Sequence, residues 1–316
     1  MKISQPTTPL KVDVALLTER RYAGNYTTQD DWYLGNILRD DELLQDALAR
    51  IGLSSIRVDW SRTDVDWSLF RCAVFRTTWD YFDRITEFCT WLRRVQSQTR
   101  LCNTPEIIWW NLDKHYLVDL ASRNVPVVPF RLLEPGAAPS LREVLDAAGW
   151  DEAVLKPCIS GGARHTYRLN RETADTVQTL VQPHLDAETF LLQPFIKDII
   201  HTGEDTVMVI NGRVTHAVRK VPKAGDFRVQ DDYGGTVHLL DPSPEHIELA
   251  ERAMAACNPY PSYGRVDMVR CEDGRLAVME LELIEPELWL RHHPQAADNF
   301  ALAIAQHLAD PDARRR

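Results

Sequence analysis

The alternation of apolar and polar positions across residues 263–286 predicts a β-hairpin. Two alternating runs flank a polar turn at residues 272–275, and its central Asp-Gly pair is typical of a tight hairpin turn. Side chains along a strand alternate between its two faces, so Glu280 and Glu282 of the second run share one face. The pattern therefore predicts two carboxylates on the same side of a sheet.

Asp267 adds a third carboxylate to this face. Closing the hairpin at its turn places Asp267 opposite Glu280. Residues directly opposite each other on two antiparallel strands have Cβ atoms about 5 Å apart. Like charges this close resist ionisation unless a cation lies among them, and carboxylates suit a hard divalent cation. Arg265, two residues before Asp267, points to the same face. A solvated outer face is the alternative, although both runs have the Val, Leu and Met content of central strands.

Strands that alternate with helices predict a parallel α/β domain in the first third of the chain. A helix capped by Asp40 or Asp41 carries apolar residues at helical spacing and ends at Gly52. This order favours crossover connections, and parallel sheets bind ligands at the carboxyl ends of their strands. The predicted buried strands are residues 11–17, 56–59 and 71–75.

The segment R-T-T-W-D-Y, residues 76–81, follows the third predicted strand and is rich in groups that bind small polar molecules. Arg76 and Asp80 are candidate substrate contacts, because arginine can hold a carboxylate with two hydrogen bonds. A structural loop with Trp79 in the core, or surface ion pairs, would explain the same residues.

Helical periodicity is present at residues 88–95 and again at residues 109–120, where Lys114 lies in the first turns. A lysine at such a position is usually a solvated surface residue. Pro126 and Pro129 follow and mark the expected start of a second domain.

A strand at residues 153–157 carries Lys156 and leads into a loop of small residues. Backbone N–H groups of such a loop can cradle phosphate. The loop is not a Walker A motif, because it lacks Gly-Lys-Ser/Thr and joins two strands rather than a strand and a helix. By itself, such a loop between two strands is more often an ordinary hairpin connection than a phosphate-binding loop. The loop residues singled out are Ser160, Gly161 and Gly162.

The remaining pattern predicts an antiparallel region that ends in a helix. Residues 190–196 form a strand whose Pro194 suggests an edge or a hinge. Asn211-Gly212 separates two further strands, the second of which ends in Arg219 and Lys220. A polar loop with Arg228 and Gln230 follows, and long loops in compact domains are usually functional or disordered. Predicted helices cover residues 175–185, 245–257 and 296–308.

Composition narrows the class of protein. The chain has 316 residues, 44% hydrophobic and 26% charged, which suits a globular protein of two or three domains. A net charge of -10 with no basic block except three final arginines argues against nucleic acid as a partner. We expect neither a transmembrane segment nor a signal peptide. Six singly placed cysteines predict reduced thiols in a cytoplasmic protein, without a disulfide frame or a zinc site.

Taken in order, these motifs resemble the ATP-grasp superfamily. The set comprises Lys114, the strand lysine Lys156 before a Ser-Gly-Gly loop, the Q-P-F-I segment at residues 193–196, and the G-R-V-D and E-x-E motifs of the hairpin. The separation between Asp267 and Glu280 is similar to that of D-alanine–D-alanine ligases. Residues 203–235 look most like bacterial glutathione synthetase. No single motif is specific, but the ordered set is.

The resemblance implies an ATP-grasp fold, in which a parallel α/β pre-domain precedes two α+β subdomains that clasp ATP. It implies a flexible leader at residues 1–10, a pre-domain at 11–122, a central subdomain at 123–196, a metal-binding subdomain at 197–310 and a tail at 311–316. Four motifs look like a narrower subgroup that includes the O-ureido-serine cyclo-ligase of cycloserine biosynthesis. They are R-T-T-W-D-Y, W-N-L-D-K-H-Y-L, G-D-F-R-V-Q-D-D-Y-G-G and M-E-L-E-L-I-E-P.

The family's mechanism implies roles for the residues that match its motifs. ATP would be held through its phosphates by Lys114, Lys156 and the loop Ser160, Gly161 and Gly162, and through adenine by Gln193, Phe195 and Ile196. One or two Mg²⁺ ions, or Mn²⁺, would be held by Asp267, Glu280 and Glu282. Arg265, assisted by Arg219 or Lys220, would stabilise the transferring phosphoryl group. Arg76, Asp80, Arg228 and Gln230 are the candidates for substrate binding. Glu282 departs from the asparagine usual at this position, which leaves the metal preference open.

The leading hypothesis is therefore a cytoplasmic, ATP-dependent carboxylate–amine ligase or cyclo-ligase that acts on a small amino-acid-like metabolite. The resemblance also suggests a place in amino acid metabolism or antibiotic biosynthesis, and a homodimer is a common outcome. Two alternatives are an ATP-dependent small-molecule kinase and a nucleotide-binding module without turnover. The second is disfavoured because the carboxylates, both lysines and Arg265 are all present.

Overall fold

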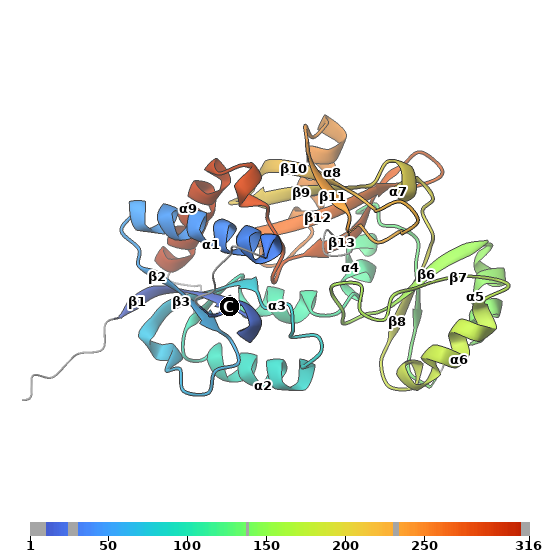
Figure 1. The fold of residues 1–316 in the computed structure, drawn as a ribbon, viewed down its shortest axis with the longest axis horizontal. Coiled ribbons are helices and arrows are strands. Elements are labelled where there is room, and N and C mark those ends of the chain that lie inside the picture. Colours follow the sequence, from blue (N-terminus) through green and yellow to red (C-terminus); the bar gives the residue numbers. More distant parts are fainter. Residues whose placement is uncertain (1–10, 25–30, 137–138, 230–233, 311–316) are drawn as a thin grey trace, which may run out of the picture. The chain divides into compact units, whose positions relative to one another are not determined.

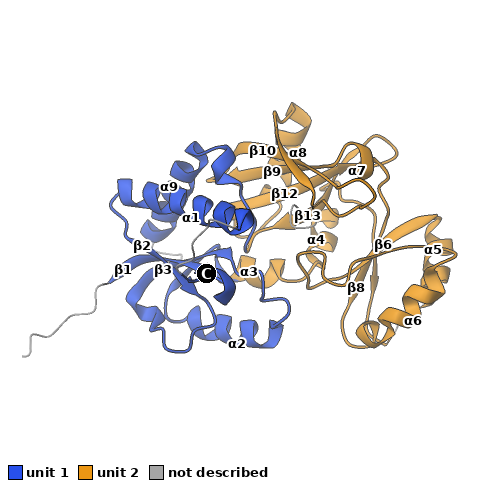
Figure 2. Cartoon of the chain, in the orientation of Figure 1, with its two compact units in different colours: residues 1–105, 285–316 blue, residues 106–284 orange. Residues whose placement is uncertain are grey.

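The structure is a computed structural model that describes residues 11–24, 31–136, 139–229 and 234–310. The predicted leader and tail, and the candidate residue Gln230, lie outside the described residues. The chain divides into two compact units, Met1–Pro105 with Glu285–Arg316 as unit 1 and Glu106–Ile284 as unit 2 (Figure 2). The three-part division expected from the sequence stays a prediction.

Unit 1 is built on the predicted parallel sheet. Its strand order is β2-β1-β3-β4, and each neighbouring pair is parallel. Figure 1 shows α1 and α9 on one side of this sheet and α2 on the other. The elements of unit 1 are β1 (Val12–Thr18), η1 (Arg20–Tyr22), α1 (Trp32–Arg50), β2 (Ser55–Asp59), η2 (Trp67–Leu69), β3 (Phe70–Thr77), α2 (Ile85–Val95), β4 (Arg100–Cys102), η4 (Leu290–His292) and α9 (Gln295–Ala309).

The first helix begins earlier than predicted. Asp31 caps α1 by accepting a hydrogen bond from the backbone N–H of Leu34 at 2.9 Å. Asp40 and Asp41 therefore do not cap the helix but lie buried in its middle. The prediction was wrong because acidic residues are common caps, and the sequence does not reveal their distant basic partners.

Those partners explain why two carboxylates lie in the core of unit 1. Asp41 accepts from the Nε atoms of Arg57 at 2.8 Å and Arg76 at 3.1 Å. Asp40 lies 3.1 Å from Nη1 of Arg291 and also accepts the backbone N–H of Arg291 at 2.9 Å. Buried charges are tolerated only when they are paired in this way.

The smaller sheet of unit 2 has the strand order β5-β8-β6-β7, and all its pairs are antiparallel. Apolar side chains of α5 and α6 pack on one of its faces with Leu155, Phe190 and Leu192. Pro194 ends β8, but β8 lies between two strands, so the prediction of an edge strand was wrong. The elements are β5 (Arg131–Leu133), α5 (Leu141–Ala148), β6 (Glu152–Pro157), β7 (Tyr167–Asn170), α6 (Ala174–Leu185) and β8 (Phe190–Pro194).

The larger sheet of unit 2 is antiparallel and has the strand order β11-β10-β9-β12-β13. The predicted Asn211-Gly212 turn joins β9 to β10, and both residues have positive φ, of 54° and 73°. The elements are α3 (Pro105–Asn111), α4 (Tyr116–Ser122), α7 (Asp198–His201), β9 (Glu204–Ile210), β10 (Arg213–Val221), β11 (Thr236–Leu240), α8 (Pro244–Ala255), β12 (Tyr263–Arg270) and β13 (Leu276–Glu282).

The carboxylate hairpin consists of β12 and β13. β12 is a central strand, as predicted, but β13 is the last strand of the sheet. Its outer edge is paired by the segment before β5, because Val128 donates to the backbone oxygen of Val278 at 3.0 Å and Val278 donates to that of Pro126 at 2.9 Å. Val128 and Ile196 lie on the two connections between the sheets, and both belong to one apolar cluster with Ala277.

The predicted helix at residues 109–120 is interrupted. α3 ends at Asn111 and α4 begins at Tyr116, so Lys114 lies in the break between them rather than in a helical turn. The side chain of Asn111 donates to the backbone oxygen of Leu281 at 2.9 Å and accepts from the N–H of Leu283 at 2.7 Å. These bonds tie the end of α3 to β13.

Two predictions from composition can be compared with the described residues. All six cysteines are free, which confirms the absence of a disulfide frame among them. None of the helices in the described part of the chain is both long and apolar enough to cross a membrane.

Candidate functional site

The predicted pairing of the carboxylate hairpin is confirmed. Asp267 lies opposite Glu280, and Arg265 lies opposite Glu282. The register shifts directly after Asp267, so a bulge separates this polar part of β12 from its apolar continuation. Asp267 is 5% exposed, whereas the side chains of Glu280 and Glu282 are 23% and 29% exposed. The two glutamates are thus the accessible members of the group.

Arg265 neutralises two of the three carboxylates. Its Nε and Nη2 atoms lie 3.0 Å and 2.9 Å from the two oxygens of Asp267. Nη2 also donates to Glu282 in a short ion pair. Arg265 is 8% exposed, so a planar cation with several donors is fixed within the carboxylate face.

Lys220 of β10 is the second cation on this face. Its ammonium lies 3.0 Å from Asp267 and forms a short ion pair with Glu204 of β9. Sequence reasoning missed Glu204. The Asn-Gly turn between β9 and β10 carries the signal, because it sets a register that places Glu204 opposite Lys220.

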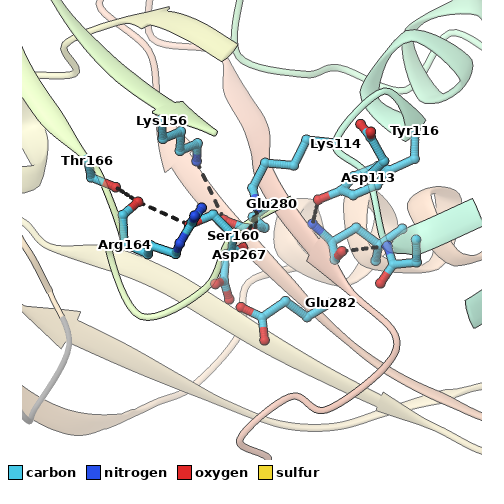
Figure 3. Close-up of polar contacts among 12 residues, drawn as sticks. Asp113, Lys114, Tyr116, Lys156, Ser160, Arg164, Thr166, Asp267, Glu280 and Glu282 are labelled. Atoms are coloured by element: carbon cyan, nitrogen blue, oxygen red, sulfur yellow. Dashed lines mark hydrogen bonds and ion pairs between the residues drawn. The ribbon is translucent and has the colours of Figure 1, made fainter. Parts of the chain in front are cut away.

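The third carboxylate, Glu280, is held by the two lysines predicted to bind phosphate (Figure 3). The ammonium of Lys114 lies 3.0 Å from Oε1 of Glu280, and that of Lys156 lies 3.5 Å from Oε2. Lys114 also donates to the backbone oxygen of Ser160 at 2.8 Å. The structure therefore brings together the helix break, the end of β6, the glycine loop and the hairpin, as the ordered motifs predict.

The pKa values of the carboxyls follow from these partners. Burial raises the pKa of Glu280, but Lys114 and Lys156 outweigh it and lower that pKa to about 2. For Asp267 burial is likewise outweighed, by Arg265 and Lys220, and the pKa falls well below its usual range. Burial raises the pKa of Glu282 to about 7 despite the nearby Arg265. Glu280 and Asp267 are therefore anionic at neutral pH, whereas the pKa of Glu282 lies near neutrality.

The donor set suits a hard divalent cation, because Asp267, Glu280 and Glu282 offer only carboxylate oxygens. Within the described residues these oxygens do not all lie within 4.8 Å of one another. Lysine and arginine side chains contact these oxygens, so the cations expected among the three carboxylates include the protein's own basic groups. A bound metal ion would share carboxylate oxygens that lysine and arginine side chains already contact. The three carboxylates fit a divalent metal ion in their chemistry, and each of them also has a basic partner in the protein.

Lys156 and Gln193 lie on the face of the smaller sheet opposite α5 and α6. Val154 of β6 pairs directly with Gln193 of β8, and Lys156 lies two residues further along β6, so these side chains share one face. The Gln193 side chain is 2% exposed, and its Nε2 atom has no hydrogen-bond partner. A buried donor without a partner is costly and is satisfied when a ligand with an acceptor binds.

Phe195 and Ile196, the two residues after β8, make several contacts within the protein. The N–H of Phe195 donates to the backbone oxygen of Glu152 at 2.9 Å. Its ring lies under the guanidinium of Arg168, 3.8 Å from the ring centroid. The backbone oxygen of Ile196 accepts from Ile199 at 3.2 Å. Any contact of this segment with adenine therefore involves atoms other than the Phe195 N–H.

The loop between β6 and β7 folds back on itself. The Ser160 hydroxyl donates to the backbone oxygen of Arg164 at 3.0 Å, and the N–H of Arg164 donates to the backbone oxygen of Gly161 at 3.0 Å. Gly162 and Ala163 have positive φ, of 55° and 58°. Two consecutive residues with positive φ form a tight turn, and the backbone N–H groups of a turn can face a bound anion.

The other basic residues singled out from the sequence have partners elsewhere. Arg219 lies on the face opposite Lys220 and holds Asp205 through two hydrogen bonds of 2.6 Å and 2.9 Å. Arg228 pairs with Asp226 at 2.7 Å within the polar loop. The structure thus places Lys220, and not Arg219, beside the three carboxylates.

In unit 1, Arg76 and Asp80 each form an ion pair, Arg76 with Asp41 and Asp80 with Arg84. Asp80 accepts from Nε1 of Trp60 at 2.7 Å and from Arg84 at 2.7 Å. Arg76 is 2% exposed, and its Nη1 atom has no partner although Nε binds Asp41. Arg76 and Trp79 line a pocket of unit 1 together with Ile37, Asp40, Thr77 and Glu287.

Two lysines that converge on a glutamate of an antiparallel sheet, beside a glycine-containing loop, are the arrangement that the resemblance to ATP-grasp ligases predicts. In agreement, residues 137–258 match the family described as prokaryotic glutathione synthetase, ATP-grasp domain. Residues 14–103 match the family described as D-cycloserine synthetase DcsG, N-terminal domain. The cycloserine biosynthesis protein DcsG of Streptomyces lavendulae is 32% identical over 283 residues, in an alignment that covers 84% of this chain and 92% of that protein. The chain belongs to the DcsG family.

Solved structures agree with this assignment. The crystal structure of D-cycloserine synthetase DcsG matches with a TM-score of 0.80 at 30% identity, covering 93% of this chain and 99% of that one. The D-alanyl-alanine synthetase A of Vibrio cholerae matches with a TM-score of 0.65 at 15% identity, covering 95% of this chain and 99% of that one. The second likeness shows the ATP-grasp fold alone. The chain is thus an enzyme of the ATP-grasp ligases, a family that uses ATP and Mg²⁺.

Proposed function

We propose that this enzyme activates the carboxylate of a small amino-acid-like molecule as an acyl phosphate and then joins it to an amine. A carboxylate oxygen would attack the γ-phosphorus of ATP, with ADP leaving. The amine nitrogen would attack the acyl carbon, with phosphate leaving and a proton lost from nitrogen. The observation that carries this proposal is the convergence of Lys114 and Lys156 on Glu280.

The lysines would serve as the phosphate ligands of ATP. Both ammonium groups are mostly buried and already share one anionic partner. A triphosphate would add negative charge beside the two ammonium groups that contact Glu280. The loop of Ser160, Gly161 and Gly162 would cover the phosphates and exclude water, which protects an acyl phosphate from hydrolysis.

Asp267, Glu280 and Glu282 would hold one or two Mg²⁺ ions, with Mn²⁺ as a possible substitute. Bound there, the metal would supply positive charge for the β- and γ-phosphates. Gln193, whose Nε2 donor lacks a partner, and the segment of Phe195 and Ile196 would contact adenine. Arg265 would stabilise charge on the transferring phosphoryl group, because it is fixed and fully charged beside the carboxylates.

Lys220 would assist Arg265 by holding Asp267 in place. Arg219 stays a candidate for the same role, although its side chain contacts Asp205. Arg76, Asp80, Arg228 and Gln230 would contact the substrate. Support for Arg76 comes from its unpartnered Nη1 atom, which is free to bind an oxygen anion.

An intramolecular reaction would account for the likeness to a cycloserine biosynthesis protein. If the amine and carboxylate belong to one molecule, the product is a ring and no second substrate is needed. We therefore propose cyclo-ligation of an amino-acid derivative, and so a role in antibiotic biosynthesis, as the specific form of the reaction.

Release of ADP and phosphate in the presence of Mg²⁺ tests the proposal. The purified enzyme is incubated with ATP and a panel of amino acids and their O-substituted derivatives, and products are identified by mass spectrometry. We expect one ADP and one phosphate per product that has lost a water. Phosphate retained on the product would instead indicate a kinase. Tight ATP binding without turnover across the panel would contradict both enzyme functions.

A further inference from the structure

Asp113, His115 and Cys158 form a cluster of three different metal-binding side chains outside the carboxylate face. One ligand atom of each lies within 4.8 Å of the others. No other trio of His, Cys, Asp or Glu residues meets this distance in the part of the chain that the structure describes. The scattered cysteines predicted no zinc site, but the fold brings Cys158, next after β6, to the break between α3 and α4.

Backbone hydrogen bonds fix the cluster in place. The N–H of Lys114 donates to the backbone oxygen of Cys158 at 3.1 Å. The N–H of Cys158 donates to the backbone oxygen of Thr189 at 2.9 Å. The N–H of His115 donates to Oδ1 of Asp113 at 3.0 Å. The three side chains therefore start from positions set by the main chain, and their proximity does not depend on long, freely rotating side chains.

The donor set selects the kind of metal. A carboxylate oxygen, an imidazole nitrogen and a thiolate sulfur are ligands of Zn²⁺ and similar borderline-soft cations, whereas Mg²⁺ takes oxygen ligands. Bond lengths of about 2.0–2.3 Å in a tetrahedral zinc site place ligand atoms roughly 3.3–3.8 Å apart. The separations within 4.8 Å therefore require only small side-chain rotations.

His115 has the hydrogen bond that a metal-bound histidine needs. Its Nδ1 atom faces Oδ1 of Asp113 at 2.5 Å, while Nε2 lies 3.0 Å from Oε1 of Glu134. The other oxygen of Glu134 accepts from the hydroxyl of Thr189 at 2.8 Å. Histidine ligands usually donate their second ring N–H to a carboxylate, which fixes the ring orientation. Glu134 supplies this contact independently of the three ligands.

Two of the three side chains of the cluster are accessible to solvent. The side chains of Asp113 and His115 are 37% and 40% exposed, whereas Cys158 is 1% exposed and forms the base. An incoming cation would therefore meet the carboxylate and the imidazole first. Burial, aided by Asp113, raises the pKa of the Cys158 thiol to about 12, so binding displaces the thiol proton.

We propose that Asp113, His115 and Cys158 bind one divalent cation of the zinc class, with water as the fourth ligand. The site is separate from the carboxylate face and does not depend on the proposed reaction. It would clamp the residues on either side of Lys114 to the end of β6. The ammonium of Lys114 contacts Glu280 and Ser160, so the cation would fix the segment that presents this lysine.

Titration with Co²⁺ tests the proposal, because a cobalt–thiolate bond absorbs in the near ultraviolet and tetrahedral Co²⁺ absorbs in the visible. The full-length, metal-depleted chain is titrated in excess Mg²⁺, which occupies oxygen-only sites. We expect both absorptions to saturate at one Co²⁺ per chain and to be abolished by one equivalent of Zn²⁺. Absence of a thiolate band at one equivalent would overturn the proposal.

Matched variants assign the band. Cys158→Ser should abolish it, whereas Cys89→Ser, at a cysteine of α2 outside the cluster, should leave it unchanged. His115→Gln and Glu134→Gln should each weaken Co²⁺ binding by about 10- to 100-fold. The His115→Gln and Glu134→Gln variants retain Cys158, so the test does not depend on the Cys158→Ser variant alone. Thermal melts check that each variant is folded. A band that persists in a folded Cys158→Ser chain, or unchanged Co²⁺ affinity in a folded His115→Gln chain, would contradict the assignment.

Discussion

The ammonium of Lys114 lies 3.0 Å from Oε1 of Glu280 and 2.8 Å from the backbone oxygen of Ser160. One side chain thereby connects the break between α3 and α4, the glycine loop and the carboxylate hairpin. Burial lowers the pKa of Lys114, but Glu280 outweighs it and raises that pKa above its usual value. The lysine is therefore a permanent cation whose position depends on Glu280.

Replacing Glu280 by Gln tests that dependence. The substitution removes the shared anion of Lys114 and Lys156 and one proposed metal ligand. We expect kcat for ADP release to fall at least about 100-fold, because phosphoryl transfer relies on positioned charge. Glu245→Gln is the matched control, since Glu245 pairs with Arg270 on the exposed surface. Equal turnover in the two variants would show that Glu280 is not part of the active site.

Lys220 should be important for stability as well as for the site. Lys220→Met leaves Glu204 and Asp267 buried with one cation fewer, and we expect the free energy of unfolding to fall by about 3–5 kcal/mol in urea titrations. Arg219→Met, on the more exposed opposite face, should cost about 1 kcal/mol or less. Adding Glu204→Gln to Lys220→Met should recover part of the loss. A double variant no more stable than Lys220→Met would refute this account.

Two glycines with similar positive φ values should respond differently to substitution by alanine. Gly203 has φ +88° and Gly274 has φ +81°, so both substitutions place a side chain in the left-handed region. A Cβ atom at Gly203 would lie 2.4 Å from the backbone oxygen of Lys220, whereas one at Gly274 would meet nothing within 4 Å. We expect a loss of about 1 kcal/mol for Gly274→Ala and at least about 1–3 kcal/mol more for Gly203→Ala. Equal losses in denaturant unfolding would mean that the close contact is relieved without cost.

Glu19 gives unit 1 a pH dependence. Burial raises the pKa of this carboxyl from 4.5 to about 7, although Arg21 opposes the shift. Between these two pH values the folded state holds a proton that the unfolded state has lost, so stability falls as pH rises from about 4.5 to 7. Glu19→Gln should remove this contribution and raise the free energy of unfolding at pH 8 by at most about 3 kcal/mol.

The comparison is made by urea unfolding of both chains at pH 4.5 and pH 8, with the difference between chains as the readout. The difference should be small at the lower pH and favour Glu19→Gln at the higher pH. A difference that is the same at both pH values would show that Glu19 is not protonated in the folded state near neutrality.

Much of the carboxylate hairpin could be predicted because its determinants are local. The Asp-Gly turn and the period of two set which residues face each other, and the pairing of Asp267 with Glu280 follows directly. The cations that neutralise the face were less predictable. Lys220 reaches Asp267 across β9, through a register that depends on a second turn and a bulge.

The errors arose where distant contacts override local pattern. The sequence Leu112-Asp113 contains no Gly or Pro to end a helix, yet the polar side chain of Asn111 binds β13 and α3 ends there. Asp40 and Asp41 looked like caps because their arginine partners lie elsewhere in the sequence. Neither case offers a signal within a short window of sequence.

The apolar cluster that contains Val128 and Ile196 has a mechanical consequence. In the described part of the chain, two crossings join the smaller sheet to the larger one, and Val128 and Ile196 of this cluster lie on them. A rotation of the smaller sheet about these crossings would move the Ser160 loop further than the strand ends beside the cluster, because this loop follows the far end of β6. The contacts of Lys114 with Ser160 and of Lys156 with Glu280 lie at that far end, so such a rotation would change them more than the packing of the apolar cluster.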